Sequence, residues 1–504
     1  MSSETGRDAE RPNIVFIHAE SMDGRKMGCM DHPATRDATP NLDALAQRGT
    51  LFRNAYSNCP VCNPSRASMW TGKYPHHDDC WNNHEGIHED VPTFRTTLES
   101  AGYRTAAIGP LDYQWGKHSI RDRVGSWTRS ACIRRPICRT PLPQVMDGEE
   151  QPHGGDWNRT YKGMQFLREA ADDDRPFMLY LTTGLVHPAF VAHRRYMERV
   201  RESEIEIPPG LGGLETTDHP VDEYMRITKN CTRRFPESLV REMRHVYFAM
   251  IAALDDMVGR VLQTLRDLGL EDTTYVIFSS DHGEMAGEHN QVLKRSMYEP
   301  SIHEPLIIAG PDVREGAEVE TPVSLIDIYP TLMDMARADY SDFTSRSGYP
   351  GDIDGESLMP QLTDGAPRQR DWAFAEYNGD RCCTGTYMLR RDRWKYVEFV
   401  GYEPQLFDLE NDPWEMDNLA AERPDVAEDM AAILAENFDC EAIDARAKQY
   451  DKRSFREWRA QALKDGIYED TMAHVYSGFD RQSIEEIMPW TDEDEAQLVE
   501  WLEE

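Results

Sequence analysis

Short apolar runs alternate with longer amphipathic stretches along most of the chain. Apolar runs lie near residues 13–17, 177–181, 275–279 and 305–309, and the stretch at 237–268 has apolar residues at helical spacing. A short continuous apolar run is typical of a strand buried on both faces, and such strands form parallel sheets covered by helices. The pattern therefore predicts an α/β fold with a large, mostly parallel sheet flanked by helices.

The chain is long enough for more than one structural unit. Its 504 residues exceed the size at which a single hydrophobic core stops growing. A polar stretch rich in Gly, Pro and Arg lies near residues 364–370, and we predict a domain boundary there. The large domain would then span 1–366 and a smaller subdomain 367–504, with strand-like segments at 387–390 and 394–397.

Polar side chains follow two of the apolar runs. The first run leads into Glu20-Ser21, and the run at 275–279 leads into Asp281-His282. Because buried parallel strands deliver side chains to their carboxyl edge, the two segments can converge. Several oxygen atoms held together suit a hard divalent cation such as Ca²⁺. We therefore predict a metal site of Glu20, Asp281 and His282, with Ser21 as a weaker ligand, although each acid alone is more typical of a solvated surface.

One short segment carries the most specific chemistry in the chain. It reads Cys62-Asn63-Pro64-Ser65-Arg66 and closes with Thr71-Gly72-Lys73. A buried structural cysteine before a helix start is the alternative, because free Cys is among the most buried residue types. The pattern C-x-P-S-R followed by T-G-K resembles the signature of the type I sulfatases. The resemblance implies that a formylglycine-generating enzyme converts Cys62 to formylglycine, whose aldehyde hydrate is the nucleophile.

Further segments extend the resemblance over nearly the whole chain. They include His187-Pro188, Gly287-Glu288-His289 and the stretch at 325–332, while rarer segments at 21–25 and 229–232 are similar to glucuronate-2-sulfatases. The family implies an alkaline-phosphatase-like fold with a mixed, mostly parallel sheet and a smaller C-terminal α+β subdomain that holds an antiparallel sheet and a helical tail. It also implies Ca²⁺ or another divalent metal, and a small-molecule or oligosaccharide sulfate ester as substrate.

The resemblance implies roles for individual side chains. The hydrate of formylglycine 62 would attack sulfur to give a covalent sulfo-enzyme, and its second hydroxyl would then expel sulfate. Arg66 matches the arginine that holds the nucleophile and the metal-side charges, and Lys294 matches the lysine on sulfate. His187 matches the histidine near the leaving oxygen, where imidazole can donate a proton. His219 matches a substrate-side histidine, for which a structural role is equally open.

Two departures from the family pattern bear on the chemistry. Glu20-Ser21 stands where the family usually has two aspartates, which leaves one carboxylate and affects the affinity and identity of the metal. Pro110 stands where the family has a lysine that reaches sulfate. We expect Lys117 or His118 to return a positive group, so that Lys117→Ala should lower turnover, and Lys73 is a further cation near the signature.

The charge balance excludes some partners. With 55 Lys and Arg against 90 Asp and Glu, the formal charge is −35, which argues against nucleic acid and against an acidic membrane surface. An anionic substrate must then depend on local positive charge, since salt screens the global field within about 10 Å. The polar segment at 1–11 and the lack of a long apolar run predict a cytoplasmic protein with mostly reduced cysteines.

Three functions remain open at the level of sequence. The first is a metal-dependent sulfatase acting on a sulfated sugar, such as a 2-sulfated uronate. The second is a phosphodiester or phosphonate monoester hydrolase with the same nucleophile and metal, because tetrahedral phosphate resembles sulfate. The third is a catalytically impaired binder of sulfated glycans, suggested by Pro110 and Glu20. The intact pair of Cys62 and Arg66 favours an enzyme.

Overall fold

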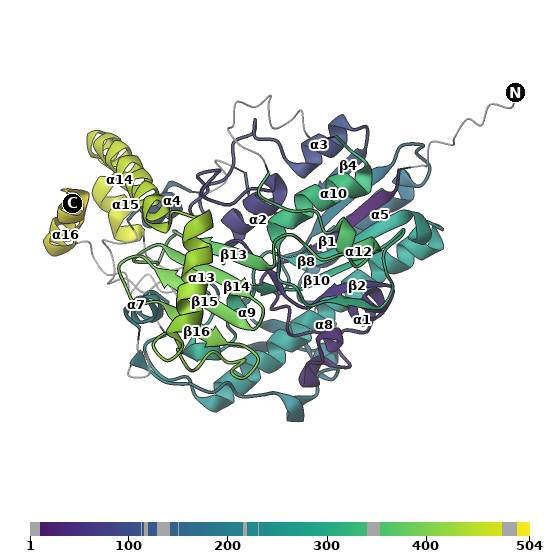
Figure 1. Ribbon diagram of the computed structural model, residues 1–504, viewed down its shortest axis with the longest axis horizontal. Helices are drawn as coiled ribbons and strands as arrows, with labels where there is room; N and C mark the ends of the chain where they lie inside the picture. Colours follow the sequence, from purple (N-terminus) through teal and green to yellow (C-terminus); the bar gives the residue numbers. More distant parts are fainter. Residues whose placement is uncertain are drawn as a thin grey trace, which may run out of the picture.

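A seven-stranded sheet forms the centre of the protein in the computed structural model (Figure 1). The structure describes residues 11–111, 113–114, 119–128, 142–149, 151–214, 219–229, 231–339, 353–475 and 491–503. In spatial order the strands are β11 (Ala317–Val319), β2 (Gly49–Phe52), β10 (Leu306–Ala309), β8 (Thr274–Ser280), β1 (Asn13–Ala19), β6 (Phe177–Thr182) and β4 (Arg104–Ile108). Only β10 runs antiparallel to its neighbours, so the sheet is mixed and mostly parallel.

The four apolar runs of the sequence are the strands β1, β6, β8 and β10. Strands β6 and β8 are buried along their whole length, as expected for parallel strands covered on both faces. The long amphipathic stretch forms helix α8 (Glu237–Asp267). The predicted α/β fold class is therefore confirmed.

Successive residues of the central strands pack into two different cores, one on each face of the sheet. Val15 and Ile17 join the core formed with α1 (Pro40–Gln47), α5 (Gly154–Ala170) and α8. Ile14 and Phe16 join the opposite core, which is covered by helices α2 (Cys62–Thr71), α3 (Phe94–Ser100), α10 (Ile328–Ala336) and α12 (Met359–Thr363). The alternation follows from the two-residue period of a strand.

A separate four-stranded antiparallel sheet lies in the C-terminal part of the chain. It consists of β13 (Trp372–Tyr377), β14 (Thr386–Arg391), β15 (Trp394–Phe399) and β16 (Gln405–Asp408), in that order. Helix α13 (Pro424–Asn437) packs on this sheet. The helices α14 (Cys440–Asp465), α15 (Tyr468–His474) and α16 (Asp492–Glu503) lie at one end of the molecule beside α4 (Ile120–Trp127) (Figure 1). The boundary between 366 and 367 stays a prediction.

Shorter elements connect these layers. The short strands are β3 (Ala55–Tyr56), β5 (Gln144–Met146), β7 (Val191–His193), β9 (His303–Glu304) and β12 (Val323–Ser324), and the short helices are α6 (Arg194–Met197), α7 (Pro220–Thr228) and α9 (Glu299–Ile302). Turns of 3₁₀ helix span Gly28–Met30, Pro33–Thr35, Glu202–Glu204, Glu271–Thr273, Glu288–Asn290 and Leu325–Asp327. Among the described residues, none of the helices has the length and apolar character required to cross a membrane.

Candidate active site

The two polar strand ends meet at one edge of the large sheet. Strands β1 and β8 pair in parallel with Ala19 opposite Ser280, so the next residues of both strands leave the sheet together. The backbone N–H of Ser21 donates a hydrogen bond to Asp281 Oδ1 at 3.1 Å. The convergence predicted for Glu20-Ser21 and Asp281-His282 is therefore present in the fold.

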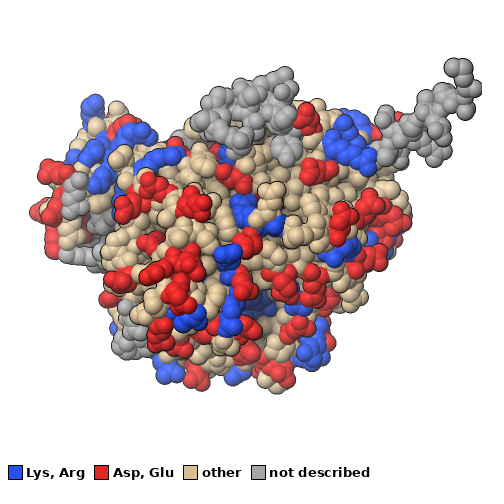
Figure 2. Space-filling view, in the orientation of Figure 1, with Lys and Arg blue, Asp and Glu red and all other residues tan. Residues whose placement is uncertain are grey.

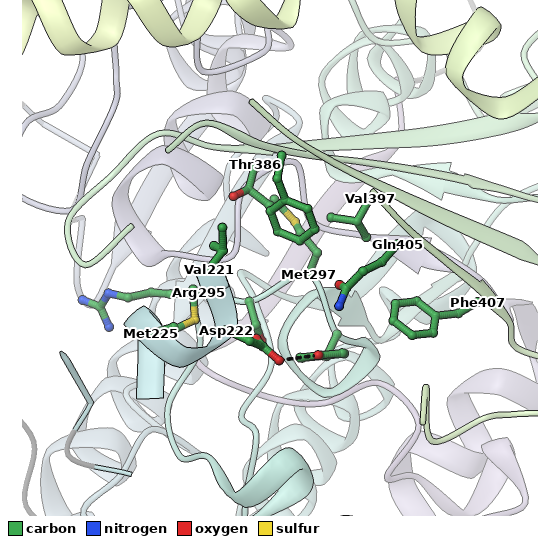
Figure 3. A pocket seen from close by; sticks show the side chains of 12 residues that line it. Val221, Asp222, Met225, Arg295, Met297, Thr386, Val397, Gln405 and Phe407 are labelled. Atoms are coloured by element: carbon green, nitrogen blue, oxygen red, sulfur yellow. Dashed lines mark hydrogen bonds between the residues drawn. The ribbon is translucent and has the colours of Figure 1, made fainter. Parts of the chain in front are cut away.

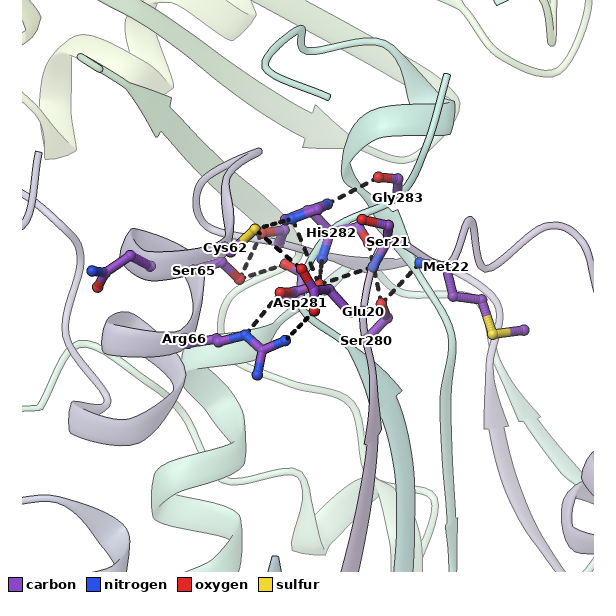
Figure 4. A network of polar contacts seen from close by, with 12 residues as sticks. Glu20, Ser21, Met22, Cys62, Ser65, Arg66, Ser280, Asp281, His282 and Gly283 are labelled. Atoms are coloured by element: carbon purple, nitrogen blue, oxygen red, sulfur yellow. Dashed lines mark hydrogen bonds and ion pairs between the residues drawn. The ribbon is translucent and has the colours of Figure 1, made fainter. Parts of the chain in front are cut away.

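Helix α2 delivers Cys62 to the same edge. Cys62 is the first residue of the helix, Val61 before it is extended, and Gly72 ends the helix with a φ of 72°. The Cys62 Sγ atom lies 3.0 Å from His282 Nε2 and 3.7 Å from Glu20 Oε1, and Figure 4 shows the three side chains together. The N-terminal end of a helix carries partial positive charge, which favours an anion at this position.

Arg66 lies one turn further along α2 and joins the helix to both strand ends. Its Nε donates to Asp281 Oδ2 at 2.8 Å, and its Nη1 donates to Thr182 Oγ1 at 3.1 Å and to the Pro110 carbonyl at 3.3 Å. Its Nη2 lies 3.8 Å from Glu20 Oε2. Burial alone would raise the pKa of Asp281, but His282 and Arg66 hold it well below its usual value. Asp281 is therefore an anion.

The imidazole of His282 is neutral and fixed in one tautomer. Burial is the main cause that lowers its pKa to about 3, and the charge of Lys294 adds to the effect. Its Nδ1 lies 2.9 Å from the carbonyl oxygen of Gly283, and a carbonyl can only accept. The proton is therefore on Nδ1, and the lone pair of Nε2 faces Cys62.

The thiol of Cys62 is protonated in the unmodified, metal-free chain. Burial raises its pKa to about 12, the nearby Lys294 lowers it, and the carboxylates of Asp281 and Glu20 raise it further. A thiol with this pKa holds almost no thiolate at neutral pH, and the thiolate is the reactive form of cysteine. The position therefore needs a different functional group if it is to act as a nucleophile.

Lys294 and His187 belong to the same cluster. Lys294 is buried, and its charge lowers the pKa of Cys62, His282 and His187. Burial is the first cause that holds the pKa of His187 well below its usual value, followed by Lys294. The structure thus brings Lys294 and His187, both predicted from sequence, into the electrostatic environment of Cys62.

The side chains at this edge fit a divalent cation. The ligand atoms of Cys62, Asp281 and His282 lie within 4.8 Å of one another, and the Glu20 carboxylate borders the same space. The hydroxyl of Ser21 is buried and has no hydrogen-bond partner among the residues that the structure describes. A buried polar group usually has a partner, so a cation beside Ser21 would account for this hydroxyl.

For the remaining predicted site residues, the structure gives no contact with Cys62 among the described residues. His219 caps α7, its Nδ1 accepts from the Val221 N–H, and its Nε2 lies 2.9 Å from the Glu403 carbonyl. Its substrate-binding role stays a prediction. Lys73 follows the opposite end of α2 from Cys62, and its substrate-binding role also stays a prediction. Lys117 and His118 lie outside the described residues.

Several contributors to the site were not found from the sequence. Ser65 donates from Oγ to the carbonyl of Asp281, and its position inside the C-x-P-S-R signature was the available signal. Thr182 ends β6 and accepts from Arg66, so it follows an apolar run as Glu20 does. Tyr247 hydrogen-bonds the turn after Glu20 from the middle of α8, where the sequence shows only an aromatic residue on a buried helix face.

A small cavity between α7 and the C-terminal sheet is not a substrate site. Figure 3 shows it lined from one side by Val221 and Asp222 and from the other by Val397 and Phe407. Its volume is about 20 Å³, which is room for one water molecule. A sugar ring therefore cannot enter it.

The molecular surface is strongly acidic. Figure 2 shows Asp and Glu side chains spread across one face among uncharged residues, with a short row of Lys and Arg side chains near its centre. The buried cations Arg66 and Lys294 contrast with this surface. Attraction of an anionic substrate would therefore be local and short-ranged.

The comparisons with known proteins agree with the motifs. The family model described as sulfatase matches residues 12–338, and one described as N-sulphoglucosamine sulphohydrolase, C-terminal, matches residues 287–439. Arylsulfatase K of Danio rerio is 36% identical over 479 residues, with 90% of this chain and 89% of the relative covered. Arylsulfatase K of Homo sapiens is 35% identical over 480 residues, with 90% and 87% covered.

Solved structures share the fold. A phosphonate monoester hydrolase of Agrobacterium radiobacter has a TM-score of 0.67 and 25% identity, with 87% of this chain and 96% of that chain covered. A protein solved with its substrate D-glucosamine-2-N,6-O-disulfate has a TM-score of 0.66 and 22% identity, with 85% and 97% covered. Together with the family match, these likenesses confirm the alkaline-phosphatase-like fold and the resemblance seen in the sequence.

Proposed function

This chain belongs to the sulfatase family and is a sulfuric ester hydrolase, and from that premise we propose that it cleaves sulfate esters of sugars with a formylglycine made from Cys62. A divalent cation would be held by Glu20, Ser21, Asp281 and His282. The substrate class that we propose is a 2-O-sulfated uronate within a glycan.

One observation carries the proposal for the nucleophile. Cys62 begins a buried helix 3.0 Å from His282 Nε2, yet its pKa of about 12 leaves it as an unreactive thiol. Formylglycine at this position would supply, as its hydrate, two hydroxyls on one carbon, a nucleophile that no encoded side chain offers. When bound, a divalent cation supplies positive charge that polarises a sulfate oxygen.

The protein's own side chains would orient and neutralise the sulfate group. Arg66 holds the carboxylate of Asp281 through a 2.8 Å ion pair, which fixes that ligand in place. Lys294 lends positive charge to the same space, where negative charge develops during cleavage. His187 is neutral in the free enzyme, and an adjacent anionic sulfate would raise its pKa toward the range in which imidazole donates a proton to the leaving oxygen.

The proposed sugar substrate rests on similarity. The relatives at 35–36% identity are named arylsulfatase K, and the segments at 21–25 and 229–232 resemble glucuronate-2-sulfatases. A protein with the same fold was solved with a sulfated glucosamine as its substrate. Of these likenesses, the resemblance of the two segments to glucuronate-2-sulfatases favours a sulfated sugar over a simple aryl sulfate.

The proposal is tested by peptide mass and turnover on the same preparation. Protein from its own host should show the mass of formylglycine at position 62 and should hydrolyse a 2-O-sulfated uronate disaccharide. Cys62→Ala should abolish turnover, whereas Cys440→Ala, a half-buried cysteine of the helical tail, should retain it. Formylglycine at position 62 without turnover of any sulfated uronate would refute the proposed substrate.

A phosphonate monoester hydrolase is the second candidate. The sequence of such an enzyme is 25% identical to this chain, and its structure matches with a TM-score of 0.67. A tetrahedral phosphonate group can bind to the same positively charged side chains as a sulfate group. The ratio of kcat/KM for a sulfated uronate to that for a phosphonate monoester decides between the two. A ratio below one would favour the second candidate.

A further inference from the structure

A second group of cationic side chains lies next to Lys294. Arg295 directly follows this lysine in the chain, and Arg381 lies in the turn between β13 and β14 of the C-terminal sheet. Both arginines pair with one acid, Asp380. We propose that Arg295 and Arg381 bind the carboxylate of the uronate and select it over a sugar that carries the same sulfate but no carboxylate. This site deepens the proposed function, on which the inference rests.

The two guanidinium groups converge on the same oxygen atom. Arg295 Nη2 donates to Asp380 Oδ2 at 3.1 Å, and Arg381 Nε lies 3.4 Å from that atom. The other oxygen, Asp380 Oδ1, accepts from the Tyr377 hydroxyl at 3.2 Å. Burial alone would raise the pKa of Asp380, but Arg295 and Arg381 hold it well below its usual value. Asp380 is therefore an anion that holds both arginines at one place.

A second carboxylate would suit the charge of this cluster. Two guanidinium groups repel each other, and Asp380 supplies one negative charge for the pair. Each guanidinium offers five N–H donors in a planar fork, so an arginine that pairs with Asp380 can bind another carboxylate at the same time. Arg295 and Arg381 are 6% and 7% exposed, so a small anion can reach them where water weakens ionic contacts only partly.

The cluster borders the start of helix α2. The N–H of Arg295 donates to the Pro60 carbonyl at 3.1 Å, and Cys62 follows two residues later. Figure 3 shows the guanidinium of Arg295 pointing away from the small cavity beside α7. The turn between β13 and β14 is packed tightly, because a Cβ atom on Gly379 would lie 3.0 Å from the Trp81 carbonyl. The arginines are therefore held in place beside the proposed nucleophile.

The backbone at both arginines adopts an uncommon conformation. The φ angle is 92° at Arg295 and 62° at Arg381, and this left-handed region is unfavourable for residues other than glycine. Leu293, on the other side of Lys294, has a φ angle of 63°. Such strain persists only where the surrounding structure holds it, and it is frequent at ligand-binding sites. The strained backbone therefore supports a binding role for the two arginines.

The shape of the substrate matches two separate cationic groups. A 2-O-sulfated uronate carries its sulfate on C2 and its carboxylate on C5, at opposite positions of the sugar ring. Lys294 offers a point charge for the rounded sulfate group, whereas the planar guanidinium of Arg295 or Arg381 matches the two oxygen atoms of a carboxylate. A sugar without the carboxylate would make only the sulfate contacts. Discrimination between the two sugars should therefore depend on the arginines.

Binding to a variant that cannot form the nucleophile tests the site without turnover. Cys62→Ala is titrated by calorimetry with a disaccharide that contains a 2-O-sulfated uronate, and with the same disaccharide after reduction of its carboxyl group to an alcohol. The salt and divalent-cation concentrations stay constant. The reduced disaccharide should bind about tenfold to 100-fold more weakly, as expected for the loss of hydrogen bonds to a charged group.

Further substitutions in the Cys62→Ala background assign this preference. Arg381→Gln removes one guanidinium group, and the ratio of the two Kd values should fall toward one. Arg199→Gln makes the same change at a part-buried arginine that pairs with Asp256 of α8 at 2.6 Å, and it should keep the ratio. Circular dichroism checks folding. If Arg381→Gln does not fold, Arg381→Lys takes its place, because it keeps the charge without the planar fork and should also lower the ratio.

Equal or unmeasurable binding of the two disaccharides by Cys62→Ala would overturn the inference, as would an unchanged ratio in the folded Arg381 variant. A disaccharide with a further sulfate on the neighbouring sugar tests the other anion that arginines bind. Affinity that depends on this sulfate and not on the carboxyl group counts against the proposed carboxylate site.

Turnover by wild type separates this site from the proposed function. Hydrolysis of sulfate esters together with equal binding of the two disaccharides overturns only the carboxylate site. A preference for the carboxylate that depends on Arg381, without hydrolysis of any sulfate ester, supports the carboxylate site and overturns the proposed function.

Discussion

At the scale of single residues, Arg66 carries the densest set of polar contacts at the site. Its guanidinium bonds Asp281, Thr182 and the Pro110 carbonyl, and its side chain is 1% exposed. Lysine offers one point charge in place of the planar fork and cannot make these contacts together. We expect Arg66→Lys to misplace Asp281 and to lower kcat/KM about 100-fold, since a displacement of 1 Å at a catalytic centre has this effect.

A matched control tests whether the loss of activity depends on the position of Arg66 or follows from any change of arginine to lysine. Arg175→Lys makes the same change at an exposed arginine that pairs with Asp173 at 2.8 Å. Its kcat/KM should stay within a factor of two of wild type, because exposed ion pairs contribute little. Equal losses of activity in the two variants would show that the planar guanidinium of Arg66 is not needed to hold Asp281 in place.

His32 makes the stability of the protein depend on pH. Burial, followed by the charges of Lys26 and Arg244, lowers its pKa to about 2, so the folded protein holds it neutral. Its contribution to stability is complete above pH 6.5 and is lost as the pH falls toward the folded pKa. Relative to His32→Gln, wild type should lose about 2 kcal/mol of unfolding free energy between pH 7.5 and pH 5.

Urea denaturation at the two pH values measures this difference. The variant itself acts as the non-titrating reference, so other groups that respond to pH cancel in the comparison. A difference between the two proteins that does not change with pH would mean that His32 can be protonated within the folded state.

At the scale of elements, helix α8 supports the turn after β1, which carries the proposed metal ligands Glu20 and Ser21. Tyr247, which is completely buried, donates to the Ser21 carbonyl at 2.8 Å and accepts from the Asp23 N–H at 3.0 Å. Tyr247→Phe would leave both backbone groups buried without a partner. We expect a loss of about 1–3 kcal/mol in unfolding free energy and a smaller stabilisation by an added divalent cation.

The control is Tyr161→Phe, which removes a hydroxyl from a side chain on α5 that is 56% exposed. This variant should match wild type in urea denaturation and in the thermal shift with metal. Loss of stability in Tyr247→Phe with an unchanged metal response would limit the tyrosine to a role in folding.

The elements that could be predicted from sequence are those whose pattern of apolar residues fits only one kind of secondary structure. Strands β1, β6 and β8 are apolar runs buried on both faces, and the period of α8 admits only a long amphipathic helix. The antiparallel strand β10 is an apolar run of the same kind, so its direction could not be predicted. Direction depends on the connection that precedes a strand, and the residues within the strand do not encode it.

The site residues that could be predicted from sequence either follow a buried strand directly or belong to a rare signature. Glu20, Asp281 and His282 directly follow buried strands, and Cys62 and Arg66 belong to a rare signature. Tyr247 could not be found in this way, because a tyrosine on a buried helix face looks like part of the core. Its hydroxyl meets the turn after Glu20 only once α8 packs across the sheet.

At the scale of the whole molecule, buried charges connect the C-terminal sheet to the catalytic layer. Lys395 on β15 is fully buried and lies 3.0 Å from Glu299 Oε1 on α9, and it also contacts Glu415. The N–H of Glu299 donates to Glu415 Oε2 at 2.7 Å. Because Glu299 follows Lys294 by five residues in the chain, this network fixes the segment that carries Lys294, the lysine proposed to contact sulfate.

Removal of the cation should therefore affect both stability and turnover. Lys395→Met keeps the length of the side chain but leaves two buried carboxylates without their cation, and breaking a buried pair in this way costs about 3–5 kcal/mol. The loss should be smaller at pH 5.5 than at pH 8 in urea denaturation, because Glu415, whose pKa burial raises to about 7, can then take up a proton.

Lys448→Met, at a part-exposed pair with Asp444, should cost less than 1 kcal/mol at either pH. If the two variants were equally stable, the Lys395 network would not hold the C-terminal sheet in place, and Lys294 would not depend on this network for its position.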